Sequence, residues 1–285
     1  MAKRYTRAEF LSRLRSQITQ GRPLVMAGAG NGITARCMER GGVDAIGVYT
    51  SSYLNAQGHG PLAAMLPIVD ANELVYTMGR REVLRQVKEV PVVAGLAGVD
   101  PLRDMRLFLE DCRRVGFSGV HNFPSVGWLD GEFRRSLEAS ELGMEHEVSL
   151  LLMAREMDML TVACAFNEAD CERLMREATP DVFIFHAGLA RAASGNGRAS
   201  DIVEAATRSQ RHYAIARRIK PDVILLAQGA ALANPEDVQY FLDHTDCHGV
   251  QLGCAIDPIA IERPVEARAA AYKSVHFPTT GRPGI

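Results

Sequence analysis

The chain has 285 residues, of which 47% are hydrophobic and 23% are charged, a composition typical of a globular protein with a sizeable core. Lysine and arginine together number 32 and aspartate and glutamate 34, so the formal net charge is −2. This balance argues against nucleic acid as the main partner, because no surplus of cations is present to bind a phosphate backbone.

Membrane and export signals are also missing from the sequence. The longest apolar stretch, 149–166, is interrupted by Arg155, Glu156 and Asp158, well short of the ~20 apolar residues that cross a bilayer. The charged N-terminus leads into an amphipathic segment and not into an apolar signal core. None of the six cysteines forms a C-x-x-C pair, which is typical of reduced intracellular thiols and gives no zinc site. We therefore expect a cytoplasmic protein with no membrane contact.

The first predicted element is a helix. Thr6 and Glu9 have the spacing of a capping box, and Gly21 stands where the helix would end. Three apolar side chains share one face of it: Phe10, Leu14 and Ile18. We interpret it as a helix that leads into the main fold.

Eight short apolar runs follow, each succeeded by a helical pattern. They cover 23–28, 44–50, 90–96, 118–123, 160–166, 181–187, 222–228 and 249–253. Continuous apolar runs are typical of parallel strands covered on both faces. Helix-start signals such as Asn234-Pro235 agree with this division. The pattern predicts a (β/α)8 TIM barrel with an N-terminal lead-in helix, in which residues 1–285 form a single domain and the barrel covers about 22–275.

A doubly wound open sheet is the alternative fold. It requires a G-x-G-x-x-G turn after the first strand, but Ile33 follows Gly28 and Gly30 where the third glycine belongs. The acidic residue expected at the end of the second strand is also missing, since 49–52 reads YTSS. These departures favour the barrel.

The segment 50–73 is too long for a simple connection and is expected to be a lid or a binding element. It contains His59 and ends near Asp70. Asp70 and Glu73 have the spacing of a capping box, so Asp70 is either a helix N-cap or a catalytic carboxylate. One residue can serve both roles.

In such barrels the site is built from residues at the carboxyl ends of the strands. His186 ends the sixth run and is a candidate acid, base or carbonyl polariser, or else a core histidine. Asn122 is a candidate oxyanion donor, or else a bridge between loops. The remaining candidates are small or polar residues that would bind an anionic or carbonyl-bearing ligand: Gly28, Gly30, Asn31, Ser51, Ser52, Gln228, Gly229 and Gly253.

Two other groups are weaker candidates. Cys254 is a possible nucleophile, but no base is specified near it, and a buried thiol is the simpler interpretation. Glu145, His146 and Glu147 are adjacent on a predicted helix, where successive side chains diverge by about 100° and cannot chelate one ion together. At most Glu145 or Glu147 faces the site.

Several segments together resemble a known family. They are MAGAGNGITAR, VDAIGVYTSSYLNAQGHGPLAAMLPIVDANE, VPVVAGLAGVDP, GFSGVHNFPSVGWLDGEFR, the strand end at His186, and LLAQGAALANPEDVQYFLD. In this order they resemble the phosphoenolpyruvate hydrolase-like TIM barrels, over about 10–273. That family also supplies the C-terminal barrel of a plant antiviral resistance protein, and it is similar to the phosphoenolpyruvate mutase and isocitrate lyase superfamily. The resemblance implies a TIM barrel, homo-oligomerisation and a functional Asp70.

The superfamily holds Mg²⁺ with acidic residues at the ends of the third and fourth strands. The positions that the resemblance assigns to these ligands hold Gly95 and Ala97, and Asn122-Phe123 on the fourth strand. Because Mg²⁺ requires oxygen ligands and mainly carboxylates, we expect no tightly bound metal or other cofactor. A divalent ion held by Asp70, Asp100 and Glu147 remains a further possibility.

The leading functional hypothesis is a hydrolase or lyase that acts on a small 2-oxo acid or on a phosphonate or enol-phosphate anion. It would cleave or hydrate a C–C, P–C or C–O bond. The alternative is a non-catalytic barrel that binds a small ligand and works through oligomerisation or partner contact. We expect a homo-oligomer, because the apolar helix face around 150–153 exceeds what one barrel contact would bury.

Overall fold

A computed structural model describes residues 2–188, 198–229, 231–232, 234–253 and 257–274. Eight parallel strands form a closed barrel in the order β1 to β8. Their bounds are β1 Leu24–Gly28, β2 Ala45–Val48, β3 Val92–Gly95, β4 Gly119–His121, β5 Leu160–Ala165, β6 Val182–His186, β7 Ile224–Gln228 and β8 Gly249–Leu252. Each lies within one of the eight apolar runs, so the predicted TIM barrel is confirmed and the open sheet is excluded.

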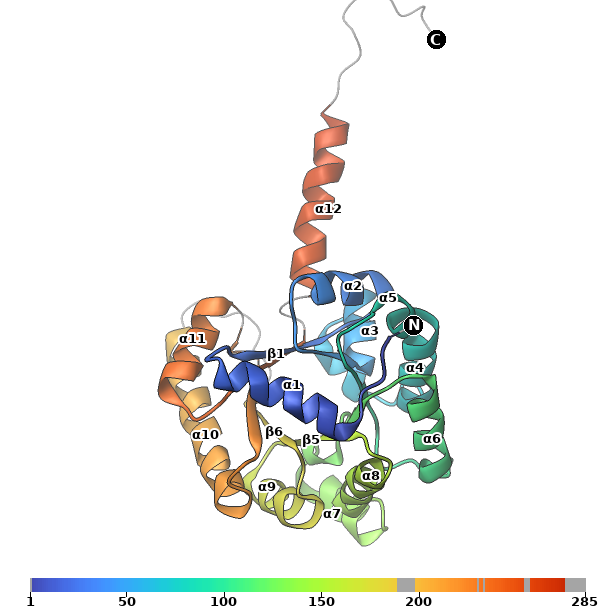
Figure 1. Cartoon of the computed structure of the whole chain (residues 1–285), viewed down its shortest axis with the longest axis vertical. Helices are drawn as coiled ribbons and strands as arrows, with labels where there is room; N and C mark the ends of the chain where they lie inside the picture. Colours follow the sequence, from blue (N-terminus) through green and yellow to red (C-terminus); the bar gives the residue numbers. More distant parts are fainter. Residues whose placement is uncertain (1, 189–197, 230, 233, 254–256, 275–285) are drawn as a thin grey trace, which may run out of the picture.

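Helices surround the barrel (Figure 1). They are α1 Arg7–Thr19, α2 Gly32–Arg40, α3 Thr50–Ala56, α4 Ala71–Met78, α5 Leu84–Gln86, α6 Met105–Val115, α7 Gly131–Ala139, α8 Met144–Glu156, α9 Glu168–Arg173, α10 Arg198–Ile219, α11 Pro235–His244 and α12 Asp257–Lys273. Short 3-10 helices are η1 Pro61–Met65 and η3 Val126–Trp128, and π-helical turns are η2 Gly79–Val83 and η4 Leu174–Ala178.

The lead-in helix α1 lies across one end of the barrel (Figure 1). Its predicted capping box between Thr6 and Glu9 is present. Phe10 and Leu14 pack with the side chains that fill the barrel interior, so α1 closes the amino-terminal end. Arg7 fixes the helix to β6 through an ion pair with the buried Asp181, at 2.6 Å. The opposite end is left as the mouth.

The segment 50–73, which was expected to be a lid or a binding element, is partly helical. Thr50–Ala56 is the helix α3, and Pro61–Met65 is the short helix η1. Thr50, Ser51 and Ser52 therefore form the first turn of a helix that begins directly after β2, and their backbones are folded against the barrel.

The last helix, α12, projects away from the barrel body (Figure 1). Ile261, Val265 and Tyr272 are exposed along it. By contrast α8 buries Leu150 and Leu151 completely in its own barrel. Leu152 is 37% exposed and Met153 is partly buried, so α8 retains less outward apolar surface than expected.

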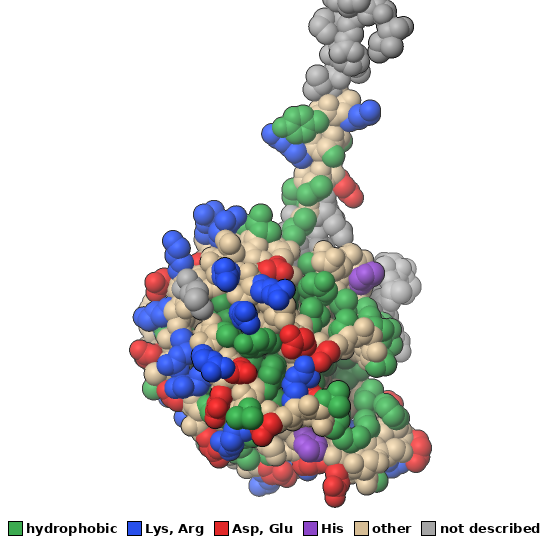
Figure 2. All heavy atoms as spheres, turned by 90° about the vertical axis from the view of Figure 1, so that its right-hand side faces the viewer, with side chains coloured by type: hydrophobic (Ala, Val, Ile, Leu, Met, Phe, Trp, Pro, Cys, Tyr) green, Lys and Arg blue, Asp and Glu red, His purple; other side chains and the backbone are tan. Residues whose placement is uncertain are grey.

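Cationic side chains gather on the side of the barrel formed by α2, η2 and α5 (Figure 2). This basic face consists of Lys3, Arg4, Arg36, Arg40, Arg80, Arg81, Arg85 and Lys88. The segments 3–4, 32–40 and 79–89 hold these eight cations and three carboxylates, Glu39, Glu82 and Glu89, which leaves a surplus of five cations. Within the described residues none of the eight cations forms an ion pair, whereas Arg7, Arg103 and Arg134 do so elsewhere.

None of the helices among the described residues is long and apolar enough to span a membrane.

Candidate functional site at the barrel mouth

The mouth is built differently on its two sides. On the side of β1, β2 and β3, the strand ends carry glycines, and the ring of Tyr49 lies over them. A Cβ on Gly47 or Gly95 would overlap the Tyr49 ring, and one on Gly28 would approach it to 3.1 Å. Tyr49 is buried and packs with the interior side chains. These glycines therefore create the space that the Tyr49 ring fills.

Tyr49 starts a buried chain of polar groups. Its hydroxyl lies 3.0 Å from Nδ1 of His121, and the side-chain amide of Gln251 hydrogen-bonds the same hydroxyl. Burial, followed by the nearby His186, lowers the pKa of His121 to about 3, so the ring is neutral at physiological pH. Its Nε2 is buried and has no hydrogen-bond partner among the described residues.

His186 lies on the other side of the mouth, at the end of β6, and is buried. The N–H of Gly188 donates to its Nδ1 at 3.2 Å, so the neutral ring carries its proton on Nε2. Burial lowers the pKa of His186 to about 4. His186 is thus a neutral imidazole with an N–H donor at the mouth.

Two glutamines lie beside His186. Gln228 pairs with His186 in register between β6 and β7. Since Ala227 pairs with Val250, Gln251 lies on β8 at the next position around the barrel. The Oε1 atoms of both glutamines are buried and have no hydrogen-bond partner among the described residues. Buried polar atoms in native proteins are nearly always satisfied, so these oxygens indicate a place for a ligand or water.

Aromatic rings enclose His186. Phe166 stacks on it, with ring centroids 5.3 Å apart, and Trp128 meets its edge at 5.1 Å. Phe123 lies 6.0 Å from the ring of His121. These rings limit the access of water, which strengthens hydrogen bonds made to the two imidazoles.

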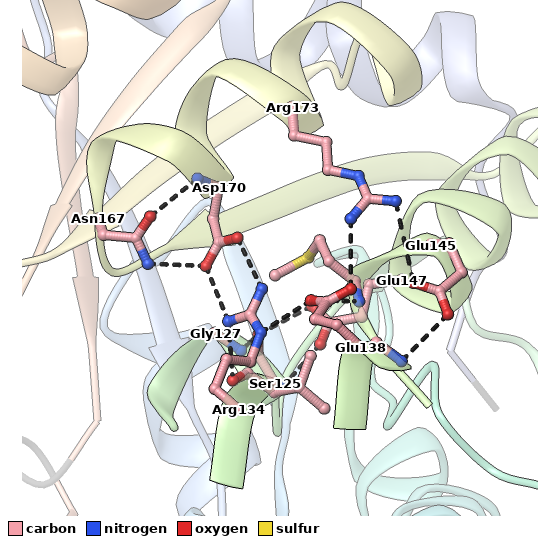
Figure 3. A network of polar contacts seen from close by, with 12 residues as sticks. Ser125, Gly127, Arg134, Glu138, Glu145, Glu147, Asn167, Asp170 and Arg173 are labelled. Atoms are coloured by element: carbon pink, nitrogen blue, oxygen red, sulfur yellow. Dashed lines mark hydrogen bonds and ion pairs between the residues drawn. The ribbon is translucent and has the colours of Figure 1, made fainter. Parts of the chain in front are cut away.

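A network of polar contacts holds the segment that carries Trp128 (Figure 3). The carboxylate of the fully buried Glu147 accepts hydrogen bonds from Asn122 Nδ2, Ser125 Oγ and Val126 N at 2.6, 2.8 and 2.7 Å. Burial raises the pKa of Glu147 to about 7, and the three donors oppose this rise. Glu147 thus anchors the segment that carries Trp128.

The other side of this segment is held by Arg134 (Figure 3). Arg134 binds both oxygens of Asp170, at 3.0 and 2.8 Å, and donates to the carbonyl of Val126. Asn167 donates to Asp170 as well, at 2.7 Å. The segment between β4 and α7 is therefore fixed from α7, α8 and α9 together.

Asn122 is fully engaged within the protein. Its Nδ2 donates to Glu147 and to the carbonyl of Cys164, and its Oδ1 accepts from the Cys164 N–H at 2.7 Å. These contacts join β4, β5 and α8. This is the bridging role that the sequence also allowed, and both donors of the amide are occupied.

Asp70 lies on the rim, on the side of β3. It caps α4 by accepting from Glu73 N at 3.0 Å, and it pairs with Arg103 at 2.6 Å. Arg103 also pairs with Asp100 at 2.6 Å, and Asn72 ties Asp100 to the end of β3 through the carbonyl of Ala97. Asp70 and His186 belong to opposite sides of the ring of strands, so the structure does not bring these two candidates together.

Most binding candidates after β1 and β2 serve packing or capping. Asn31 caps α2 by accepting from Thr34 N. A Cβ on Gly28 or Gly30 would overlap Ser52 of α3, and Ser52 itself is buried, whereas Ser51 is partly exposed. The small residues here allow α3 to approach β1 closely.

The candidates after β7 and β8 are only partly described. Gly229 has a φ of +148° and lies against Ala187 and Gly188. Gly253 has open space around its Cα. Residues 230, 233 and 254–256, including Cys254, lie outside the described residues.

Comparison with known proteins places the chain in a family. The model of the phosphoenolpyruvate hydrolase-like family matches residues 9–275. The chain belongs to this family. The phosphoenolpyruvate hydrolase-like chain is 39% identical over 271 residues to the ToMV resistance protein Tm-1(GCR237) of Solanum lycopersicum. This match covers 94% of the chain and 36% of the relative, so the chain spans about a third of that protein's length.

Two solved structures share the fold of the phosphoenolpyruvate hydrolase-like barrel. Phosphoenolpyruvate phosphomutase from Streptomyces platensis subsp. rosaceus has a TM-score of 0.59 and 16% identity, with 93% of this chain and 86% of that chain covered. Phosphonopyruvate hydrolase in complex with oxalate and Mg²⁺ has a TM-score of 0.56 and 14% identity, with 93% and 86% covered. At these identities the likeness concerns the fold.

The donor set of the phosphoenolpyruvate hydrolase-like barrel does not fit Mg²⁺ at the third strand. Gly95 and Ala97 offer no carboxylate, and any side chain at position 95 would overlap the Tyr49 ring. In the part of the chain that the structure describes, no three His, Cys, Asp or Glu side chains converge on one point. Asp70 and Asp100 bind Arg103, and Glu147 binds the segment after β4, so each carboxylate of the alternative metal site is engaged within the protein.

Sequence reasoning missed several residues that this family member brings to its mouth. Tyr49, His121 and Gln251 lie inside apolar runs, for which the pattern predicts strands and no functional side chain. Alternation within the apolar run 118–123 would have found His121, because it is two residues from the inward Phe123. Glu147 was considered only as a metal ligand, and Trp128 was not considered.

Proposed function

We propose that this barrel is a hydrolase or lyase that binds a small 2-oxo acid, or a related phosphonate or enol-phosphate anion, at its mouth and acts without a tightly bound metal. One observation carries the proposal. Three buried polar atoms at the mouth, Nε2 of His121 and the Oε1 atoms of Gln228 and Gln251, have no partner among the described residues. Family membership supports the reaction class.

The polar atoms suit the two reactants of a hydrolysis. Imidazole N–H groups of His121 and His186 donate to carbonyl or carboxylate oxygens of the substrate. The two carboxamide oxygens accept hydrogen bonds, and a water molecule offers two donors to such a pair. Phosphonopyruvate hydrolase shares this fold, which supports attack by water on a bond next to a carbonyl.

We assign His186 the role of carbonyl polariser. Its Nε2 proton is fixed because the Gly188 N–H occupies Nδ1. A neutral imidazole in an enclosed, aromatic-lined position is a donor that does not add a full charge to the substrate complex.

A substrate panel tests the proposal. Phosphonopyruvate, oxaloacetate and phosphoenolpyruvate are incubated with the native protein in EDTA, and the release of pyruvate, phosphate and oxalate is measured. We expect turnover of one of them, with kcat reduced about 100-fold in His186→Gln. His244→Gln on the surface is the matched control. If no member of the panel is turned over in EDTA or in Mg²⁺, the enzymatic proposal fails.

Assembly into a homo-oligomer is the second part of the proposal. It is also what the alternative requires, in which a non-catalytic barrel binds a small ligand and works through oligomerisation. The projecting helix α12, with Ile261, Val265 and Tyr272 exposed, supports it, because an unpacked helix gains stability by burying such side chains on another copy. Light scattering of the native chain and of a deletion of 257–285 tests it. We expect an oligomer that the deletion converts to a monomer.

We also place the protein in the cytoplasm. The five described cysteines are unpaired, and four of them are buried, which supports a reducing compartment. Cell fractionation tests this location.

A further inference from the structure

The third strand ends without a carboxylate that could hold a metal ion. Phosphonopyruvate hydrolase, which shares the fold, binds oxalate together with Mg²⁺, and a cation stabilises negative charge that develops on a substrate oxygen. Here the position of a carboxylate ligand, Gly95, is covered by the Tyr49 ring. If an oxyanion is bound at this mouth, another group must stabilise it.

The hydrogen-bond directions around Tyr49 identify such a group. Gln251 Oε1 has no partner, so the bond from Gln251 to the Tyr49 oxygen is donated by its amide N–H. Among the described residues, Nδ1 of His121 is the one acceptor that the structure places within hydrogen-bond distance of the Tyr49 hydroxyl, so the buried hydroxyl donates its proton there. This leaves the proton of the neutral imidazole on Nε2, the buried atom that lacks a partner.

We propose that the chain Gln251–Tyr49–His121 replaces the divalent cation, by holding His121 in the tautomer that presents Nε2–H to a carboxylate or carbonyl oxygen of the 2-oxo acid. The inference rests on the proposed function and deepens it. His121 is the residue that contacts the substrate, and Tyr49 and Gln251 are positioning residues that act through it. In this barrel the Tyr49 ring stands where a carboxylate ligand would be, and the neutral Nε2–H of His121 takes the role of the metal ion.

The packing around Tyr49 supports the exchange independently of the hydrogen bonds. Three neighbouring strands carry glycine beside the ring: a Cβ on Gly47 or Gly95 would overlap it, and a Cβ on Gly28 would approach it to 3.1 Å. The ring of His121 meets that of Tyr49 edge to face, with centroids 5.5 Å apart. The hydroxyl is therefore held in place by shape as well as by hydrogen bonds, which pre-organises the donor.

Calorimetric titration with oxalate tests the inference. We expect the native protein to bind oxalate with the same Kd in EDTA and in Mg²⁺. Tyr49→Phe keeps the ring and removes the hydroxyl, and it should raise the Kd about tenfold, because His121 is then free to place its proton on either nitrogen. Tyr76→Phe, on α4 outside the mouth, is the matched control and should bind as the native protein does.

Nitrogen NMR of labelled histidine gives a second readout that does not depend on turnover. The native His121 should show one tautomer, with the proton on Nε2, and Tyr49→Phe should show a mixture of both. The same spectra report whether the variant is folded.

The outcomes separate the two proposals. A Kd that falls tenfold or more when Mg²⁺ is added would overturn the inference, and so would an unchanged Kd in Tyr49→Phe. If Tyr49→Phe weakens oxalate binding but no substrate is turned over, the inference stands and the proposed enzymatic activity fails. If the native protein does not bind oxalate, the inference fails whatever the substrate panel shows.

Discussion

The two sides of the barrel mouth differ in the residues that stand at the ends of their strands. On the side of β1 to β3 the strand ends are glycines, and their function is to make room for the Tyr49 ring and for α3. On the side of β4 to β8 the strand ends carry His121, His186, Gln228 and Gln251, whose polar atoms are buried and partly unsatisfied. The first side is filled by packed side chains, whereas the second side carries the polar atoms that can contact a ligand.

This difference shows that a glycine-rich strand end does not by itself indicate a ligand. Gly28 and Gly30 were expected to let the backbone approach an anion, yet Ser52 of the same chain lies against both. Substitutions of the glycines on the first side should therefore affect stability, and substitutions of the residues that contact His186 on the second side should affect binding. The predictions below test this division from the largest expected effect to the smallest.

The largest effect concerns Glu147, which supports the second side. Burial raises its pKa from 4.5 to about 7, so the native state retains a proton that the unfolded state loses. The corresponding stability is present below pH 4.5 and is lost as pH rises through 7, by about 3 kcal/mol. Urea unfolding of the native protein and of Glu147→Gln should show their difference in unfolding free energy declining by this amount between pH 4 and pH 8.

His121 and His186 change stability in the opposite direction. Their pKa values are lowered by burial, so their contribution is lost as pH falls below 6.5. Because both histidines are present in native protein and in Glu147→Gln, their effect cancels in the difference. A difference that grows with pH would mean that the three donors to Glu147 outweigh its burial.

Gly95→Ala should produce the next largest effect. The new Cβ would overlap the Tyr49 ring and approach the Phe123 carbonyl to 2.9 Å, and such overpacking lowers the free energy of unfolding by about 2 kcal/mol. Gly60→Ala is the matched control, because its φ is −71° and its Cβ meets open space. Gly95→Ala should cost less when it is made in Tyr49→Val, where the ring is absent. A Gly95→Ala protein as stable as the native one would contradict the packing described here.

Trp128→Leu should alter binding more than folding. Trp128 is partly exposed and meets the edge of His186, and an aromatic pair of this kind contributes about 1 kcal/mol beyond the area that it buries. We expect oxalate affinity to fall about fivefold by calorimetry. Phe133→Leu on α7, where the ring is exposed, is the control, and equal effects of the two substitutions would place the ligand away from His186.

Asp70→Asn should produce the smallest effect. Asparagine preserves the cap on α4, so only the partly exposed ion pair with Arg103 is lost, at a cost below about 1 kcal/mol. We expect oxalate binding and turnover to be retained. A loss of turnover with binding intact would instead make Asp70 the catalytic carboxylate and would give the first side of the mouth a chemical role.

The sequence was informative about the fold for a physical reason. Parallel strands covered on both faces need continuous apolar runs, and helices of this length begin at caps such as Thr6 and Asn234, both of which form capping boxes. Local patterns of this kind do not depend on distant parts of the chain. All eight strands could therefore be predicted.

The candidate site was harder to predict from the sequence, because its contacts form only when the barrel closes. His186 and Gln228 end apolar runs and were identified for that reason. Tyr49 and His121 are 72 residues apart, and their contact exists only because β2 and β4 flank β3 in the closed ring. Gln251 joins them from β8 through the same closure. No local pattern specifies which glycine will lie beneath which ring.

The basic face over α2, η2 and α5 gives the molecule a permanent electric dipole, although its net charge is only −2. The eight cations lie on the wall of the barrel and not at its mouth. A negatively charged support would therefore capture the molecule by this wall in one preferred orientation and leave the mouth facing sideways and open. The orienting force would reach about 10 Å at 0.1 M salt, so adsorption should be released by salt without disturbing the neutral groups that line the mouth.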